Sequence, residues 1–211
     1  MTKFRAWVFV VNGEELLHKA IRSLEYVRDV LTIVDNSPKG IGDVPFGTVY
    51  RPPIPLTFAQ SQNYILQESR KSGCSFYLWI HHDAEAIGDS CQKMVELAVS
   101  LEESQKNWGL CFSSYDAFVA FNTKAFDSIG GWDEELTWYC GDVDAYRRLN
   151  LAGYELIESH LPVKHTPSQT LNSDPKIKRE VDLMFSLREE YYIRKWGNSP
   201  GKETFTTPFG K

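Results

Sequence analysis

The amino-acid sequence predicts an α/β fold with a mostly parallel central sheet flanked by helices, and two observations carry this prediction. Apolar runs of strand length alternate with helical patterns as far as Phe112, an order typical of folds with a parallel sheet. The run Phe76–Ile80 is apolar throughout, which favours a central strand covered on both faces. Strand–helix–strand connections are right-handed, so the polar turns after these strands should open on one edge of the sheet.

Each element is predicted from its own pattern, in chain order. Strands are runs of apolar or β-branched residues, and they are expected at 4–11, 30–34, 48–50, 76–80, 109–112 and 117–121. Helices carry apolar residues on one face, and they are expected at 16–24, 58–71, 90–101 and 123–129, with another opening at Asp142. Asn12-Gly13 should end the first strand, and Thr57 should cap the helix over 58–71.

Composition limits the possible classes of protein. The 211 residues are 42% hydrophobic and 24% charged, enough for one substantial core. A formal charge of −5 argues against a nucleic-acid partner, which would require a basic surface. The early apolar run Ala6–Val11 is too short for a signal sequence or a membrane span, so we expect a soluble, cytoplasmic protein. The four cysteines form no Cys-x-x-Cys pair, and reduced structural thiols are expected.

The domain organisation is expected to be simple. Residues 1–170 should form the main domain, and 171–211 should add a helix and a tail packed on it. Apolar residues at helical spacing in this tail are most simply explained as core packing. The alternative is that the loop Pro167–Asn172 and the tail helix form one wall of an acceptor site, where aromatic side chains suit sugar rings.

Polar residues at predicted strand ends mark a candidate site. Asp83 follows the central strand, and ligands of α/β sheets bind at the carboxyl ends of such strands. A carboxylate on a rigid strand end is a suitable ligand for a hard divalent cation. The simpler explanation is a solvated polar turn. Asn12 and Asp35, after the first two strands, should lie at the same edge of the sheet.

A second acidic cluster lies downstream, where Asp142 and Asp144 open a helix. Acids at a helix N-terminus are stabilised by the helix dipole, and an arginine at helical spacing would pair with Asp144, so a structural role explains one of them. The aromatic residues Trp138 and Tyr139 would raise the basicity of a nearby carboxylate by desolvation, as a general base requires. His165 should return to the same edge.

These motifs, in this order, resemble the family 2 glycosyltransferases of GT-A fold, inverting enzymes that use a nucleotide-sugar and a divalent metal. The resemblance covers about residues 4–165 and rests on six short motifs. They are Val11-Asn12-Gly13, Ile33-Val34-Asp35, the helix with Asn63, His81-His82-Asp83, Gly130-Gly131-Trp132-Asp133-Glu134, and Gly141-Asp142-Val143-Asp144. One departure is clear: His81 stands where the metal-binding Asp-x-Asp motif has its first aspartate.

The resemblance implies a role for each matching residue. Asp83 and His165 would hold Mn²⁺ or Mg²⁺, and Asp142 would be the catalytic base. The nucleotide-sugar donor, with UDP expected, would be bound by Val11, Asn12, Asp35, Asn63, His82 and Asp83. Arg51 or Arg70 would approach the sugar or the phosphates. The expected reaction moves a hexose or deoxyhexose to a hydroxyl of a glycan acceptor.

Two alternatives to a glycosyltransferase remain. A sugar-nucleotidyltransferase usually has a glycine-rich phosphate loop after its first strand, whereas Val11-Asn12-Gly13-Glu14-Glu15 has one glycine and two acids. A non-catalytic sugar-binding module would suit the six tryptophans and ten tyrosines, but not the clustered acids. The chain length would also suit one domain of a larger viral or bacterial glycosylation protein, whose further domains would then be partners. The sequence names neither the sugar nor the acceptor, since loops set both.

Overall fold

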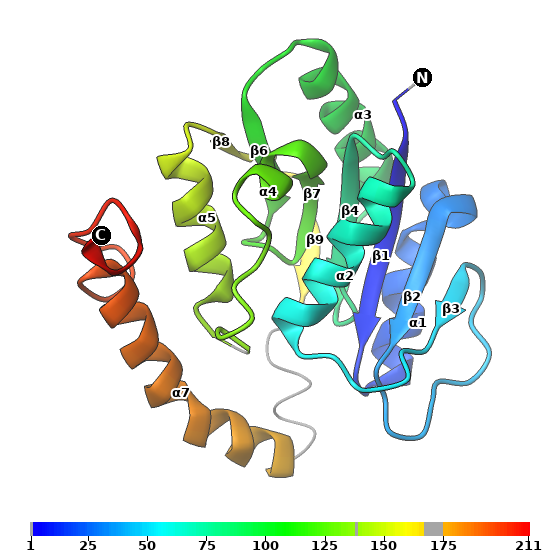
Figure 1. The fold of residues 1–211 in the computed structure, drawn as a ribbon. Helices are drawn as coiled ribbons and strands as arrows, with labels where there is room; N and C mark the ends of the chain where they lie inside the picture. The colour runs from blue at the N-terminus through cyan, green and yellow to red at the C-terminus, as the bar shows by residue number, and fades with distance from the viewer. Residues whose placement is uncertain (1, 138, 167–174) are drawn as a thin grey trace.

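The computed structural model describes residues 2–137, 139–166 and 175–211, and its centre is a seven-stranded sheet with strand order β3-β2-β1-β4-β7-β6-β8 (Figure 1). The strands are β1 Phe4–Val10, β2 Leu31–Asp35, β3 Thr48–Tyr50, β4 Phe76–His81, β6 Trp108–Ser113, β7 Phe118–Asn122 and β8 Glu155–Glu158. Strands β1 to β4 run parallel to one another, and β8 runs parallel to β6. Only β7 runs against both its partners in this sheet. The mostly parallel α/β fold is confirmed.

Helices cover both faces of the sheet (Figure 1). One face carries α1 Glu14–Ser23 and α3 Ser90–Glu103, together with the 3₁₀ segment Glu25–Val30. The other carries α2 Phe58–Lys71, α4 Thr123–Ser128 and α5 Gly141–Leu151. The C-terminal part adds α7 Pro175–Trp196 and a short 3₁₀ turn, Pro208–Gly210. The result is a three-layer arrangement with two separate apolar cores.

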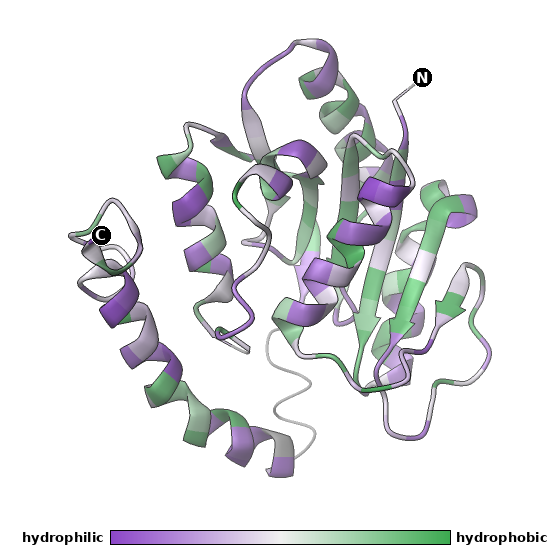
Figure 2. Cartoon of the chain, in the orientation of Figure 1, coloured by the Kyte–Doolittle hydropathy of each residue, from purple (hydrophilic) through white to green (hydrophobic). Residues whose placement is uncertain are grey.

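Strand β4 divides its side chains between the two cores. Phe76, Leu78 and Ile80 pack towards α1 and α3, whereas Tyr77 and Trp79 pack towards α2 and α4. All five are at most 3% exposed, which confirms the strand covered on both faces that the unbroken apolar run predicts. In Figure 2 the central strands are accordingly green, and the outer faces of the helices carry the purple, hydrophilic residues.

Several local predictions are also confirmed. The helix over 58–71 has the predicted bounds, and the Thr57 hydroxyl accepts from the backbone N–H of Gln60 while the Gln60 side chain accepts from that of Thr57. The turns after β1 and β2 do open on one edge, since the N–H of Asn36 donates to the carbonyl of Val10 over 2.8 Å.

A two-stranded sheet beyond β4 was not predicted. It pairs β5 Ala84–Ala86 antiparallel with β9 Val163–His165, so the segment ending in His165 joins this sheet and not the main one. Three-residue strands show no clear periodicity, and alanine and glutamate are depleted in strands. The pairing places His165 opposite Ala84, directly after Asp83.

The last turns of α7 are docked against the main domain (Figure 1), and Val181 in its first half is also buried, at 1% exposed. Tyr192 and Trp196 are fully buried against Leu136. Leu183, in the same half, is 67% exposed. The Pro167–Asn172 loop of the acceptor-wall alternative lies outside the described residues, and the 171–211 tail domain stays a prediction. None of the described helices is both long and apolar enough to cross a bilayer.

A buried ion cluster fixes the docked end of α7. The Lys195 ammonium lies 2.6 Å from an oxygen of Asp133 and 2.7 Å from one of Asp144, and it is only 5% exposed as a residue. Arg148 pairs with the other oxygen of Asp144 at 2.8 Å, as helical spacing predicts. Two cations thus face two anions, and each buried charge has a partner, which is the condition for burying charge.

Trp196→Ala should therefore lower the free energy of unfolding by about 3–5 kcal/mol, because it empties a buried aromatic site. It also removes the Trp196 indole N–H that donates to Asp144 over 2.8 Å. Urea denaturation followed by circular dichroism measures the effect. Leu183→Ala, at an exposed position of the same helix, is the matched control and should change stability little. A loss below about 1 kcal/mol for Trp196→Ala would contradict stable docking of α7.

Candidate active site

The polar turns after β1 and β4 lie side by side at the edge where the parallel strands end. A Cβ on Gly13 would stand 3.5 Å from His82 Nε2, so these two turns are in van der Waals contact. Gly13 has φ +82, a conformation that favours glycine. The side-chain oxygen of Asn12 is buried and accepts no hydrogen bond from the described residues. An unused buried acceptor at this edge is a suitable contact for a ligand.

Asp83, His165 and His81 converge at the end of β4. Their potential ligand atoms all lie within 4.8 Å of one another. One Asp83 oxygen is 3.4 Å from His165 Nε2 and 3.8 Å from His81 Nδ1. The β5–β9 pairing produces this meeting, and the N–H of Thr166 donates to the Asp83 carbonyl over 3.1 Å. The structure thus brings together the two predicted metal ligands and adds His81.

The electrostatics of this group suit cation binding. Burial on its own would raise the pKa of Asp83, but the His165 hydrogen bond and the neighbouring imidazoles outweigh it and hold that pKa below its usual value. Burial lowers the pKa of His81 and of His82, although the negative charge of nearby carboxylates acts to raise both. An ionised carboxylate and neutral imidazoles are the forms that bind metals. The donor set therefore fits a divalent cation.

Asp116 is a further acidic residue at this site that the sequence analysis did not single out. It lies in the turn between β6 and β7, and its Oδ1 stands 3.8 Å from His81 Nε2. The Tyr146 hydroxyl donates to its other oxygen over 3.4 Å. The two preceding residues, Ser114 and Tyr115, both have positive φ, at 52° and 58°. Such backbone strain in non-glycine residues is concentrated at functional sites. Two consecutive strands joined by a short polar turn were the signal that could have located it.

Asp142 lies in the first turn of α5, close enough to Asp116 and Tyr146 for its charge to interact with theirs. Burial and the negative charge of Asp116 raise its pKa above the usual value, although backbone N–H donors oppose the rise. A carboxylate whose proton affinity is raised in this way is suited to act as a general base. Asp144, two residues on, is fully buried and already holds Arg148, Lys195 and Trp196.

Asp35 and Asn63 make contacts inside the protein. Asp35 is 3% exposed, and its carboxylate accepts from the backbone N–H of Ser37 over 2.9 Å and of Ile41 over 3.2 Å. The Asn63 amide donates to the carbonyl of Trp132 and accepts from its N–H. A Cβ on Gly131, at φ +76, would stand 2.6 Å from the Asn63 oxygen, so this turn requires glycine.

The basic residues considered for the donor are engaged as well. Arg51 donates to the carbonyls of Ser37 and Pro38, and Arg70 pairs with Asp127 at 2.8 Å. Val11 is half-buried at the end of β1. The roles of Val11, Asn12, Asp35, Asn63, His82, Asp83, Asp142 and His165 in binding or catalysis stay predictions.

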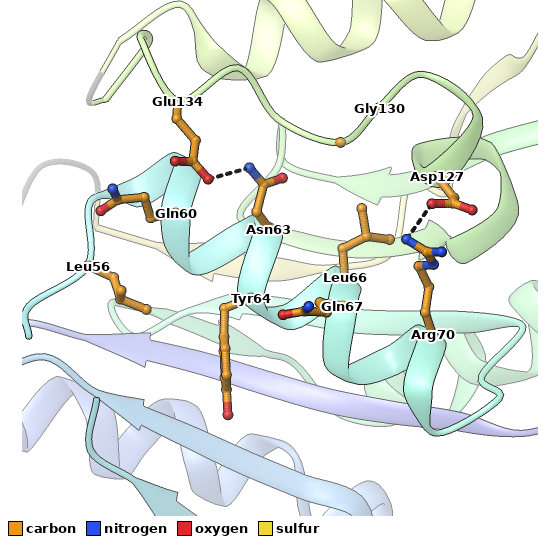
Figure 3. Close-up of a pocket in the computed structure, with 11 residues that line it drawn as sticks. Leu56, Gln60, Asn63, Tyr64, Leu66, Gln67, Arg70, Asp127, Gly130 and Glu134 are labelled. Atoms are coloured by element: carbon orange, nitrogen blue, oxygen red, sulfur yellow. Dashed lines mark hydrogen bonds and ion pairs between the residues drawn. The ribbon is translucent and has the colours of Figure 1, made fainter. Parts of the chain in front are cut away.

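A cavity of about 600 Å³ lies elsewhere, between α2 and the loop before α5 (Figure 3). The Asn63–Glu134 hydrogen bond and the Arg70–Asp127 ion pair cross it. Of the predicted site residues, Asn63 and Arg70 line it. Because the cavity contains none of the metal-competent residues, we place the chemistry at the strand ends and not here.

Comparison with known proteins identifies the fold. No family model matches the sequence, and no curated protein matches it either. Residues 1–349 of S. aureus TarS superpose with a TM-score of 0.57 at 12% identity, covering 85% of this chain and 65% of that one. Glucosyl-3-phosphoglycerate synthase from Mycobacterium tuberculosis, in complex with Mn²⁺ and UDP, gives 0.55 at 11% identity, covering 89% and 80%. A cytidylyltransferase from Leptospira borgpetersenii gives 0.51 at 10% identity, covering 97% and 100%.

These similarities confirm the fold class at the level of its architecture. The chain has a GT-A-like, Rossmann-like fold shared with nucleotide-sugar transferases, and it spans about two thirds of the TarS fragment, 65% of its length. Since identities are near 10%, the comparisons do not distinguish sugar transfer from nucleotidyl transfer.

Asp142→Asn should stabilise the protein at pH 8 and lose this advantage at pH 4. A carboxyl whose pKa is raised by folding favours the folded state below its unfolded pKa, and this contribution is lost as the pH rises through the folded pKa. The amide of the variant carries no charge at either pH, so the variant does not lose stability as the pH rises. Thermal unfolding of both proteins at the two pH values measures it. Equal stability differences at pH 4 and pH 8 would contradict the raised pKa.

Proposed function

We propose that this protein is an inverting glycosyltransferase that moves a hexose or deoxyhexose from a nucleoside-diphosphate sugar, UDP being expected, to a hydroxyl of a glycan acceptor. The observation that carries the proposal is the pairing of two groups at one edge of the sheet. The metal-competent cluster His81, Asp83 and His165 and the desolvated carboxylate Asp142 are linked there through Asp116. Neutralising a diphosphate and activating a hydroxyl are the two tasks of sugar transfer.

The cation site fits Mn²⁺ or Mg²⁺, which when bound would neutralise the negative charge that develops on the departing diphosphate. Asp83 and His165 would hold it. The rigidity of the support favours this role, because Asp83 is 8% exposed and sits between β4 and β5. The complex of the mycobacterial synthase contains both Mn²⁺ and UDP, which agrees with this assignment.

Asp142 would act as the base. A sugar hydroxyl is a weak nucleophile at neutral pH, so a carboxylate must accept its proton as the new bond forms. Its raised pKa increases its proton affinity, and it lies in the first turn of α5. Attack from the side opposite the diphosphate would invert the configuration at the anomeric carbon.

The nucleotide would lie along the ends of β1 and β2. Asn12 offers an unused buried oxygen, and His82 and Val11 adjoin it at the turns after β4 and β1. Asp35 would accept from the base, although its oxygens already accept three protein donors. Asn63 would contribute to the donor site indirectly, by holding the Gly131-Trp132 turn in place with its amide hydrogen bonds. Further domains of a larger polypeptide would be compatible with this arrangement.

A sugar-nucleotidyltransferase is the second candidate, favoured by the likeness to the cytidylyltransferase fold. The turn after β1 has a single glycine, Gly13, followed by Glu14 and Glu15, which makes a poor cradle for a triphosphate. Product analysis separates the two. UDP release from UDP-sugars with Mn²⁺ favours the glycosyltransferase, and pyrophosphate release from a nucleoside triphosphate and a sugar phosphate favours the alternative.

Asp83→Ala should abolish the metal dependence of UDP binding while the fold stays intact, because the side chain stands at a strand end. Calorimetry of UDP binding with and without Mn²⁺ measures this. Asp29→Ala is the matched control, since Asp29 is an exposed carboxylate at the opposite edge of the sheet, just before β2. Metal-dependent binding that survives in Asp83→Ala would disprove the assignment.

Asp142→Asn should keep UDP binding and lose transfer, by about 10²–10⁴-fold, the usual contribution of a positioned base. Transfer to a glycan acceptor is measured alongside slow hydrolysis of the donor. A variant that transfers sugar at the parent rate would exclude Asp142 as the base, whereas weakened UDP binding would assign it to the donor site.

A further inference from the structure

We propose that His81 is itself a ligand of the cation, and that Asp116 orients its ring. The centre would then contain two imidazoles and one carboxylate, and it would prefer first-row transition metals such as Mn²⁺ and Co²⁺ to Mg²⁺. This inference rests on the cation of the proposed function, but it does not depend on sugar transfer. It assigns a role to the histidine that replaces the first acid of the Asp-x-Asp motif.

The distances fit three ligands around one ion. Two atoms bonded to the same metal at about 2.1 Å are about 3.0 Å apart at right angles and about 3.4 Å apart in a tetrahedron. The Asp83 oxygen lies 3.4 Å from His165 Nε2 and 3.8 Å from His81 Nδ1. The two rings face each other edge to face with centroids 5.2 Å apart. Movement of the two rings towards the Asp83 oxygen would bring the three ligand atoms, which lie within 4.8 Å of one another, to these separations.

The backbone fixes the direction of His81. It is the last residue of β4, in register with Phe9 of β1, and its N–H donates to the Ala117 carbonyl over 3.0 Å. A ligand on the end of a strand held from both sides needs little reordering to bind an ion. The His81 side chain is 27% exposed, so an ion can reach it.

Asp116 supplies what a metal-bound histidine needs on its other nitrogen. Binding through Nδ1 leaves the proton on Nε2, and ligating histidines almost always donate that proton to a carboxylate, a carbonyl or water. In the described residues Nε2 of His81 is buried and makes no hydrogen bond, and Asp116 Oδ1 lies 3.8 Å away. The Tyr146 hydroxyl holds the second oxygen of Asp116 at 3.4 Å. Asp116 is therefore a positioning residue.

The preference for transition metals follows from the donor atoms. Mg²⁺ binds oxygen ligands and retains several waters, whereas imidazole nitrogen suits first-row transition metals. A cluster with two nitrogens and one oxygen therefore discriminates against Mg²⁺. With an aspartate at position 81 the same cluster would offer two carboxylates and would discriminate less.

The test measures metal binding to the full chain without nucleotide, by calorimetry with Mn²⁺ and Mg²⁺ and by the visible spectrum of Co²⁺. His81→Gln should weaken Mn²⁺ binding at least tenfold, and His160→Gln, at an exposed histidine with 78% side-chain exposure, is the matched control and should leave it unchanged. His81→Asp keeps a ligand and should move the preference towards Mg²⁺. Circular dichroism confirms that each variant is folded.

Asp116→Asn should weaken Mn²⁺ binding by about 10–100-fold, the usual effect of removing the orienting carboxylate of a ligating histidine. It should also shift the Co²⁺ absorption bands, which a purely structural role of Asp116 would leave in place. Unshifted bands would overturn the positioning role.

Two outcomes separate this inference from the proposed function. If His81→Gln and His81→Asp bind every metal as the parent does while Asp83→Ala binds none, His81 is not a ligand, and the proposed function stands without it. If Asp83→Ala also binds metals like the parent, the site itself is wrong and both proposals fail.

Discussion

The antiparallel pairing of β7 with β4 is the constraint on which the candidate site depends. In a wholly parallel sheet, the strand next to β4 would bring its amino end to the opposite edge. Because β7 runs against β4, its amino end and the β6–β7 turn lie at the carboxyl end of β4. That reversal puts Asp116 beside His81 and Tyr146. The groups at this edge therefore come from a strand end and from a hairpin turn, two kinds of support with different rigidity.

The sequence predicted the parts of this arrangement that have long-range patterns. The unbroken apolar run predicted β4 as a buried strand, and the one-sided apolar pattern predicted α2. Because Asp83 follows that apolar run, it was expected at the end of the strand. The position of His165 depends on a three-residue pairing, β5 with β9, that no periodicity marks. Asp116 was missed for a similar reason: a turn acid is not distinguishable from a solvated one until the strand direction is known. The assignments of nucleotide-binding residues stay predictions.

The C-terminal helix is coupled through buried charge to α5, the helix that carries the candidate base. Lys195 bridges Asp133, in the loop after α4, and Asp144, in α5, and the Tyr191 hydroxyl also donates to Asp133 over 3.0 Å. Removing one member would leave another buried charge unpaired, which is far more costly than losing a surface ion pair. Because Lys195 is engaged in these ion pairs, the docked half of α7 supports the site by packing. The exposed side chains of its first half, such as Leu183, are the part still able to meet an acceptor.

Asp142 and Asp144 have different surroundings because of helix geometry. Residues two apart point about 200° apart around an α-helix, so both cannot face the same surroundings. On α5, the face that carries Asp144 meets Trp196, Lys195 and Arg148, and four polar contacts satisfy its two oxygens. Asp142 consequently points elsewhere, where burial and the charge of Asp116 both raise its pKa and only backbone N–H donors among the described residues oppose them. One acid is paired with buried cations and the other has its proton affinity raised, so an Asp-x-Asp at a helix start can serve structure and chemistry at once.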